Sequence, residues 1–195
     1  MAVTHTDPIR LFEAWYAEAI DTGMKLPEAV ALATATRRGV PSMRMVLLRG
    51  VTRRGFVFFT NYESRKGREL AANPRGALLF YWPQLDRQVR VEGTIRRIAR
   101  RESAAYFQSR PRESRLAAWA SPQSRVIGDR QALEDAFADV KARFGDGHVP
   151  CPPFWGGFRL APESIEFWQS RDHRLHDRQR YVKKRRGWTV QVLGP

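Results

Sequence analysis

Basic and hydroxyl side chains gather at several points of the chain in combinations that can bind phosphate. Arg44 and Arg49 bracket a strand-like stretch, and Ser64-Arg65-Lys66 opens a helix-like one. Charged donors form short hydrogen bonds with phosphate oxygens, and the free N–H groups at the start of a helix add to the attraction for an anion. Surface salt bridging also explains such residues, and spacing alone favours that simpler interpretation.

A second set of the same kind is formed by Tyr106, Arg110 and Ser114, which fall at positions i, i+4 and i+8. They would share one face of a continuous helix, but Pro111 predicts a turn between two helices instead. Two independent phosphate sites are therefore a hypothesis that the spacing allows but does not establish.

The third set lies near the C-terminus, where Arg174, His176 and Arg178 alternate in a segment that leads into a strand. If the segment is extended, the three side chains project on one side. Two fixed cations beside a histidine suit an anionic or electron-rich ring, whereas an exposed basic strand edge explains them equally well. Both interpretations stay open at this point.

The motifs of several other kinds of functional site are absent from the sequence. The sequence contains no Gly-x-x-x-x-Gly-Lys-Ser/Thr loop, no Gly-x-Gly-x-x-Gly and no serine nucleophile elbow. His173 and His176 have no nearby cysteine and no matching His-Glu motif, so no metal site is expected. The single cysteine, Cys151, excludes an intramolecular disulfide and fits a reducing compartment.

Length and composition predict one domain over residues 1–195, with anionic partners. The chain has 195 residues, 43% of them hydrophobic, which is enough for one sizeable core. The net charge of +14 and the pI near 11.0 favour nucleic acid, anionic membrane or phosphorylated small molecules as partners. Because the arginines are spread through the chain, nucleic acid is not expected. The basic run Lys183-Lys184-Arg185-Arg186-Gly187 is interpreted as a solvated hairpin turn, and the absence of a long apolar run or signal peptide predicts a cytoplasmic protein without a membrane partner.

The elements that must position these residues are mainly strands, with peripheral helices. Asp7 as cap, Pro8 and Gly23 predict a first helix, and Asp129 caps another over 129–144, whose Leu133, Phe137, Val140 and Phe144 form a core stripe. Further helices are expected over 64–73, 101–109 and 113–120, and strands over 29–36, 42–49, 56–61, 77–82, 87–93, 157–160, 164–169, 178–183 and 188–193. Short strands joined by tight turns such as Arg37-Arg38-Gly39 indicate an antiparallel barrel of the α+β class. Its parts are an N-terminal helix (1–24), the main barrel strands (25–100), a helical insertion (101–150) and C-terminal strands (151–195).

From about residue 25 to the C-terminus, the order of these motifs resembles that of the pyridoxine/pyridoxamine 5'-phosphate oxidases, the flavoenzymes of vitamin B6 metabolism. The matching segments are Arg44-Met45-Val46-Leu47-Leu48, Phe59-Thr60-Asn61, Ser64-Arg65-Lys66, Arg87-Gln88-Val89, Ser109-Arg110-Pro111-Arg112-Glu113-Ser114, Trp119-Ala120-Ser121, Gln123-Ser124, Phe154-Trp155-Gly156-Gly157, Glu166-Phe167-Trp168 and Arg174-Leu175-His176-Asp177-Arg178. The resemblance implies an FMN-binding split β-barrel that works as a homodimer with its site at the subunit interface. It also implies hydride transfer from pyridoxine or pyridoxamine phosphate to FMN, with O2 reduced to H2O2.

The resemblance assigns roles residue by residue. The FMN ligands would be Arg44, Met45, Val46, Leu47, Leu48, Arg49, Phe59, Thr60, Arg65, Lys66, Gln88, Gln123, Ser124, Trp168 and Arg178, with Arg65 and Lys66 at the phosphate. The substrate ligands would be Arg49, Tyr106, Arg110, Ser114, Arg174, Leu175 and His176, of which Arg174 and His176 would be catalytic.

The sequence departs from the family pattern at three places. Arg49 stands where the family usually has lysine, Val192 stands where it usually has arginine, and the Arg-rich segment before the first helix is largely missing. The competing functions are a related flavin oxidase acting on another ring, of the phenazine-pathway type, and a non-catalytic flavin- or pyridoxal-phosphate-binding protein. Retention of Tyr106, Arg110 and Ser114 argues against a substrate without phosphate.

Overall fold

The computed structural model of the protein describes residues 7–195. Residues 1–6, part of the N-terminal stretch in which the sequence shows no signal peptide, lie outside that range. Among the described residues, no helix is long and apolar enough to cross a membrane.

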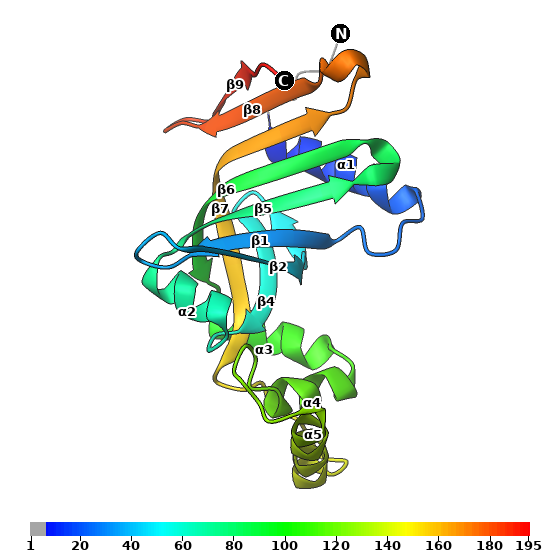
Figure 1. Ribbon diagram of the computed structural model, residues 1–195, viewed down its shortest axis with the longest axis vertical. Helices are drawn as coiled ribbons and strands as arrows, with labels where there is room; N and C mark the ends of the chain where they lie inside the picture. Colours follow the sequence, from blue (N-terminus) through cyan, green and yellow to red (C-terminus); the bar gives the residue numbers. More distant parts are fainter. Residues whose placement is uncertain (1–6) are drawn as a thin grey trace.

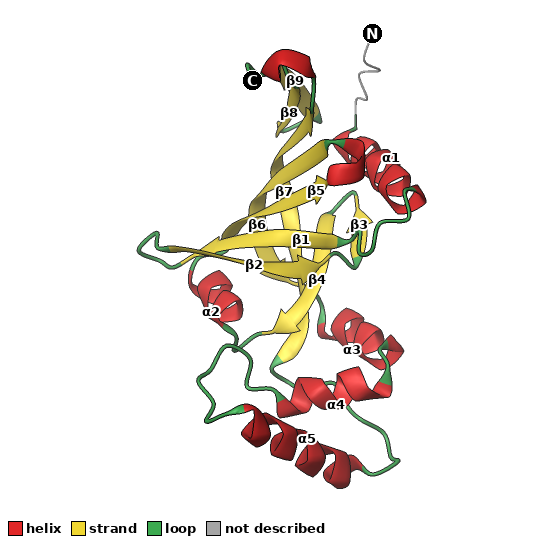
Figure 2. Ribbon diagram, turned by 45° about the vertical axis from the view of Figure 1, so that its right-hand side comes forward, coloured by secondary structure: helices red, strands yellow, loops and turns green. Residues whose placement is uncertain are grey.

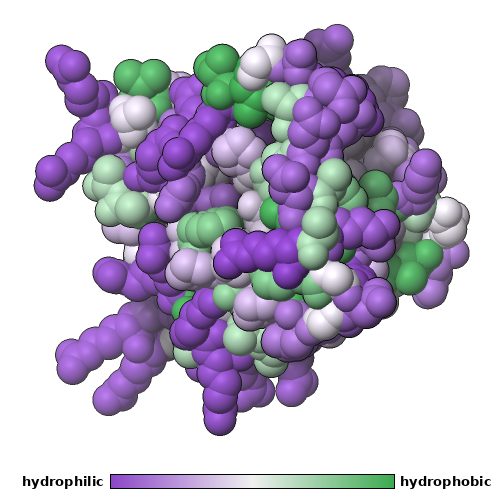
Figure 3. Space-filling model, turned by 90° about the horizontal axis from the view of Figure 1, so that it is seen from below, coloured by the Kyte–Doolittle hydropathy of each residue, from purple (hydrophilic) through white to green (hydrophobic). Residues whose placement is uncertain are grey.

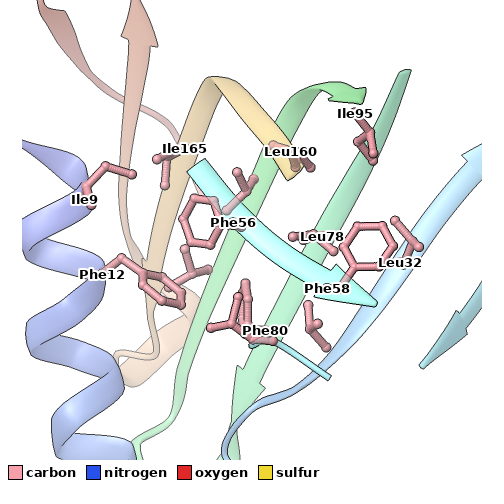
Figure 4. Close-up of a cluster of buried hydrophobic side chains, with 14 of the residues drawn as sticks. Ile9, Phe12, Leu32, Phe56, Phe58, Leu78, Phe80, Ile95, Leu160 and Ile165 are labelled. Carbon is pink, nitrogen blue, oxygen red and sulfur yellow. The ribbon is translucent and has the colours of Figure 1, made fainter. Parts of the chain in front are cut away.

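Helix α1 (Pro8–Asp21) begins and ends where its capping residues predict. The Asp7 carboxylate accepts a hydrogen bond from Ile9 N at 2.9 Å, and Gly23 follows the helix with a φ of 71°, which favours glycine. The apolar face of the helix buries Phe12 completely. Because Phe12 packs edge-on against Phe56, with ring centroids 4.8 Å apart, the helix is fixed to the core of the sheet (Figure 4).

The strands form one antiparallel sheet that curls into a split barrel, as the sequence predicts (Figure 1). Its main path runs β2-β1-β5-β6-β7-β4-β3, and β8 joins β7 to β9. The strands are β1 (Ala29–Ala35), β2 (Pro41–Leu47), β3 (Gly50–Thr52), β4 (Gly55–Asn61), β5 (Arg75–Trp82), β6 (Arg87–Arg97), β7 (Trp155–Gln169), β8 (Asp177–Lys183) and β9 (Trp188–Val192).

Two strand predictions need correction. The short strand β3 was not foreseen, and the two strands expected over 157–160 and 164–169 are one continuous strand, β7. Its first part pairs with β4 and its last part with β8, while β6 pairs with it from Phe158 to Gln169. A register shift at Gly93 absorbs the irregularity near Pro162, and an added Cβ at Gly93 would lie 2.1 Å from the Ala161 carbonyl oxygen.

Helices close the ends of the barrel. They are α2 (Arg65–Ala72), α3 (Arg100–Ser109), α4 (Arg112–Ala120) and α5 (Arg130–Phe144), with short 3-10 turns η1 (Pro83–Leu85) and η2 (Asp172–Arg174). Figure 2 shows α3, α4 and α5 together at the end of the molecule opposite η2. Viewed from that end, hydrophilic side chains cover most of the surface (Figure 3).

The stripe predicted on α5 does not reach the main core. Phe137, Val140 and Phe144 are only partly buried and pack against a small separate cluster around Trp155 and Leu116. The basic run from Lys183 forms the β8–β9 hairpin turn as predicted, with Lys184 N donating to the Gly187 carbonyl at 3.0 Å.

Candidate active site

A cavity of about 280 Å³, here called the main cavity, opens between β2, β4, α2 and α3. Ten of its eleven lining residues belong to the set predicted from sequence, although they come from distant parts of the chain. They are Met45, Val46, Leu47, Arg49, Phe59, Thr60, Lys66, Tyr106, Arg110 and Gln123. The fold therefore brings Arg49 and Lys66 of the first basic set together with Tyr106 and Arg110 of the second.

Lys66 is a buried cation in this cavity. Its ammonium group reaches the Thr60 hydroxyl at 3.2 Å, the Ser64 hydroxyl at 3.4 Å and the Gln123 side-chain oxygen at 3.2 Å, all of them neutral acceptors. Within residues 7–195, no carboxylate lies within ion-pairing distance of it. Burial, with a smaller contribution from Arg44, lowers the pKa of Lys66 to about 8. An anionic ligand would supply the charge that the protein does not.

Arg110 is a second cation without a carboxylate partner in the described part of the chain; it is half-buried and lies against an aromatic wall. The Phe59 ring stacks with both Tyr106 and Trp155, with ring centroids 3.9 Å and 5.4 Å away. The Arg110 guanidinium lies over the Trp155 ring at 4.9 Å, and its buried Nη1 has no hydrogen-bond partner. Burial lowers the pKa of Arg110, and the nearby charge of Arg49 lowers it further. Two arginines close enough to repel each other suit a shared anion.

Pro111 lies in a turn between two helices, as predicted, and this turn keeps Tyr106, Arg110 and Ser114 close to one another. Helix α3 ends at Ser109 and α4 begins at Arg112. Arg110 lines both the main cavity and an adjoining cavity of about 160 Å³, which contains Ser114. Tyr106, Arg110 and Ser114 therefore line two neighbouring cavities.

Glycines in the Phe154-Trp155-Gly156-Gly157 segment let the aromatic wall form. An added Cβ at Gly156 would lie 2.0 Å from the Tyr62 hydroxyl, and one at Gly157 would lie 2.9 Å from the Phe59 ring. Since real Cβ atoms do not approach so closely, only glycine allows β7 to pass beside these rings.

Arg44 and Arg65 do not face the main cavity. Both contact Glu69 of α2, Arg65 Nε at 2.9 Å and Arg44 Nη2 at 3.4 Å. Burial would raise the pKa of Glu69, but hydrogen bonds from Ser42, Thr34 and Arg65 outweigh it and lower that pKa to about 2. These two predicted ligands are thus held by a carboxylate at the rim of the predicted phosphate site.

Two further residues predicted as FMN ligands do not line the main cavity. Leu48 is buried in the hydrophobic core with 5% exposure. Ser124 is exposed next to Gln123 and has a φ of 67°, so its loop turns sharply there.

Three more predicted residues form one row across the sheet, and none of them lines the main cavity. Gln88 of β6 is in register with Trp168 of β7, which is in register with Arg178 of β8. We call Gln88, Trp168 and Arg178 the cross-strand row. It ends near η2, at the opposite end of the molecule from α3 and α4 (Figure 1).

The segment after this row is not extended, and the predicted alternation of Arg174, His176 and Arg178 on one side is wrong. His173 and Arg174 have φ angles of 57° and 63°, so the chain turns before β8 begins at Asp177. His176 Nδ1 accepts a hydrogen bond from Arg171 N at 3.2 Å, and its ring lies 4.7 Å from the Trp168 ring. The turn leaves Leu175 68% exposed.

Sequence reasoning missed three residues of these sites. Trp155 completes the main cavity, and Glu69 and Glu166 hold predicted arginines. A signal existed for Glu69, which follows Arg65 at the helical i+4 position, and for Trp155 in its glycine-rich segment. No local pattern connects Glu166 with Arg178.

Comparison with known proteins places the chain in a family. Residues 16–144 match the pyridoxamine 5'-phosphate oxidase model, and residues 155–195 match the pyridoxine 5'-phosphate oxidase C-terminal dimerisation region. A pyridoxine/pyridoxamine 5'-phosphate oxidase of Rubrobacter xylanophilus is 57% identical over 97% of this chain and 87% of its own length. One of Paraburkholderia phymatum is 54% identical over 97% and 89%.

Solved structures show the same fold. PhzG from Burkholderia lata, in complex with tetrahydrophenazine-1-carboxylic acid, superimposes with a TM-score of 0.93 at 33% identity, over 99% of this chain and 95% of its own. A pyridoxamine 5'-phosphate oxidase-related, FMN binding protein from Nostoc punctiforme gives a TM-score of 0.76 at 20% identity, over 100% of both chains. With most of its length matched by two family models and by relatives more than half identical, the chain belongs to the pyridoxamine 5'-phosphate oxidase family.

Proposed function

We propose that this protein oxidises pyridoxine 5'-phosphate and pyridoxamine 5'-phosphate to pyridoxal 5'-phosphate, with FMN as cofactor and O2 as electron acceptor. The observation that carries the proposal is a pair of cations, the buried Lys66 and the half-buried Arg110, which have no carboxylate partner within the described residues. A buried charge is costly unless it is paired, so each cation fits a phosphate group. Two phosphorylated ligands in one site account for both.

The FMN phosphate is assigned to Lys66 and the start of α2. Ser64 caps this helix, whose N-terminal N–H groups add to the attraction for an anion. Thr60 and Gln123 already meet the Lys66 ammonium group and would surround the same ligand. Arg65 is more than half exposed and lies one residue away, so it can turn from Glu69 towards the phosphate.

The substrate phosphate is assigned to Arg110 with Tyr106 and Ser114. The orphaned Nη1 of Arg110 would donate to it, and Arg49, at the boundary of the same cavity, would add a second positive charge. Trp155 and Phe59 hold Arg110 and Tyr106 in place through stacking. The chain therefore binds the substrate through preorganised groups.

When bound, FMN supplies the redox chemistry, accepting a hydride from the substrate and passing the electrons to O2. The protein holds the substrate ring in line for this transfer. Arg174 and His176 are assigned to the ring, with Leu175 between them, and Trp168, Gln88 and Arg178 to the flavin. A fixed cation such as Arg178 stabilises negative charge that develops nearby.

A second copy of the chain is needed because one chain separates these groups. No residue of the cross-strand row lines the main cavity, and two of its three residues, Trp168 and Arg178, belong to the segment that matches a dimerisation region. The outer sheet face also exposes Met43, Met45 and Tyr81, with 70%, 62% and 57% exposure. We infer that a homodimer covers this face and brings the row of one subunit to the main cavity of the other, with each whole chain acting as one domain.

The test of the function uses the purified protein. A yellow protein that converts pyridoxine phosphate in air into an aldehyde with equimolar peroxide supports the proposal. A colourless protein that cannot be reconstituted with FMN refutes it.

Replacing Arg110 with alanine tests the phosphate assignment. We expect KM for pyridoxine phosphate to rise by roughly tenfold to a hundredfold, because a charge-assisted contact to a dianion is lost. FMN content should be unchanged. Arg101→Ala, an exposed arginine of α3, is the matched control and should leave KM as it is. Unchanged kinetics in Arg110→Ala would remove this assignment.

Similarity to PhzG supports one second candidate, an oxidase of a phenazine-type ring. Such a ring without phosphate leaves Arg110 without a ligand, so the two candidates predict opposite results. If the second is right, Arg110→Ala leaves activity on the ring substrate unchanged, and phosphorylated B6 compounds are not turned over.

A further inference from the structure

We propose that Glu166 is a positioning residue that fixes Arg178 for contact with the flavin. The inference rests on the proposed function, because it concerns the FMN half-site that the cross-strand row contributes. Glu166 lies on β7, two residues before Trp168, and its side chain faces the same side of the sheet as the row.

Arg178 is held by two acceptors from different parts of the chain. Its Nε and Nη2 donate to Glu166 Oε1 at 2.9 and 2.7 Å, and its Nη1 donates to the Gly194 carbonyl at 2.8 Å. The two Glu166 contacts fix the plane of the guanidinium, and the Gly194 contact fixes its rotation. A long side chain that would otherwise sample many rotamers is thereby confined to one direction.

The remaining hydrogen-bond capacity of Arg178 matches a ligand. A guanidinium carries five N–H donors, and the three contacts above use three of them, which leaves two. One of these two is on Nη1 and the other on Nη2. The side chain is 25% exposed, so the free donors are accessible from the outer face of the sheet.

The burial of Glu166 indicates more than an ordinary surface ion pair. It is 4% exposed although it lies on the outer face, because Arg178 and Arg90 cover it and Arg90 donates to its other oxygen, Oε2. A carboxylate buried in this way is costly unless its hydrogen bonds are made, and here both oxygens are used. Loss of its charge would release Arg178 first, since Arg90 also pairs with Glu92 at 3.1 Å.

The decisive experiment is a double-mutant cycle on FMN binding to the apoprotein, measured by quenching of flavin fluorescence. Glu166→Gln should weaken FMN binding by about tenfold, the size seen when residues that orient a ligand-binding group are removed. In an Arg178→Gln background the same change should alter the dissociation constant by less than about twofold, because Glu166 then has nothing to orient. The flavin reduction potential, measured on the loaded protein, should fall in Glu166→Gln and in Arg178→Gln by the same amount.

The matched control is Glu163→Gln on the same strand. Glu163 forms an exposed ion pair with Arg75 at 2.6 Å and has no contact with the row, so FMN binding should not change. If Glu166→Gln is insoluble, the same cycle is run with Glu166→Asp, which keeps the charge but shortens its reach and should show the same coupling.

Four outcomes overturn the inference. Additive effects of the two changes, or wild-type FMN binding in Glu166→Gln, show that Glu166 does not act through Arg178. A Glu166→Gln protein that sediments as a monomer shows that the residue serves assembly instead. A wild-type apoprotein that takes up no FMN refutes the proposed function together with this inference, whereas the other results leave the proposed function standing.

Discussion

At the scale of single residues, the site is marked by cations that the protein itself leaves without counter-ions. Lys66 is the clearest, since the residue is 7% exposed and its ammonium group meets only neutral oxygens. Such a residue is unfavourable for the empty protein and favourable for ligand binding. Stability and function should therefore respond in opposite directions when it is replaced.

We expect Lys66→Met to stabilise the ligand-free protein at pH 7 by roughly 1–3 kcal/mol while removing FMN binding. In the folded state the Lys66 pKa is about 8, below its usual 10.5, so between these values the unfolded chain binds more protons. The free energy of unfolding of the wild type therefore rises as the pH increases from about 8 to 10.5, and the stability difference between the wild type and Lys66→Met should shrink. Chemical unfolding of the apoproteins at pH 7 and pH 10 measures both effects.

Lys141→Met, on the exposed side of α5, is the control and should change stability little at either pH. A Lys66→Met protein that is less stable than the wild type at pH 7 would show that the ammonium group contributes more through its hydrogen bonds than it costs through burial.

The sequence could predict most residues that line the main cavity but not how each is held. Phosphate-binding types such as Lys66 and Arg110 are recognisable one by one, and the fold gathers them in one cavity. The geometry around Arg174 could not be predicted, because left-handed φ angles at two non-glycine residues break the expected alternation. Glu166 was missed because its contact with Arg178 depends on strand pairing across a turn.

At the scale of elements, local signals decide where helices and strands lie, and long-range pairing decides how far they extend. Caps at Asp7 and Asp129 set the starts of two helices as predicted. Strand β7 was predicted as two pieces because Pro162 is normally disfavoured inside a strand, yet here the bulge near Gly93 accommodates it. Strand β3 was not predicted, because its three residues are too few to show the alternation of a strand.

Helix α2, which carries Lys66, is attached to the sheet through Glu69. The Glu69 carboxylate accepts from Thr34 of β1 and Ser42 of β2, and it pairs with Arg44. We expect Glu69→Gln to lower the free energy of unfolding by roughly 2–3 kcal/mol at pH 7. The replacement keeps the shape of the side chain, so the loss reports on its charge.

The acid dependence of stability tests this role. Because the folded-state pKa of Glu69 is lowered to about 2 from 4.5, its contribution is complete above about pH 4.5 and is lost as the pH falls towards 2. The difference between wild type and Glu69→Gln should therefore close over that range. Glu134→Gln is the matched control. Glu134 also pairs with an arginine four residues before it, at 2.7 Å, but this pair is exposed, so the replacement should have almost no effect on the free energy of unfolding. A difference that persists at pH 2 would rule out the charge as its cause.

At the scale of the whole molecule, the fold separates the main cavity from the cross-strand row, which the proposed function treats as two half-sites. The main cavity forms where helices α2 and α3 meet the split barrel, whereas the cross-strand row lies on the far part of the sheet. The net charge of +14 suits the two phosphorylated ligands of the proposed function, although much of it lies in exposed arginines. In the proposed dimer each site depends on both subunits, so defects in the two half-sites should complement each other.

We expect this complementation when Lys66→Met and Arg178→Gln subunits are unfolded, mixed in equal amounts and refolded together. Random pairing puts about half of the subunits into mixed dimers, and each mixed dimer contains one site with neither change. Activity should recover to about a quarter of wild type, although each variant alone is nearly inactive. Mixing Lys66→Met with Arg110→Ala is the control, because both changes lie in the main cavity of the same chain and every mixed site keeps one defect. Recovery in the control, or none in the test mixture, would mean that one chain supplies a complete site.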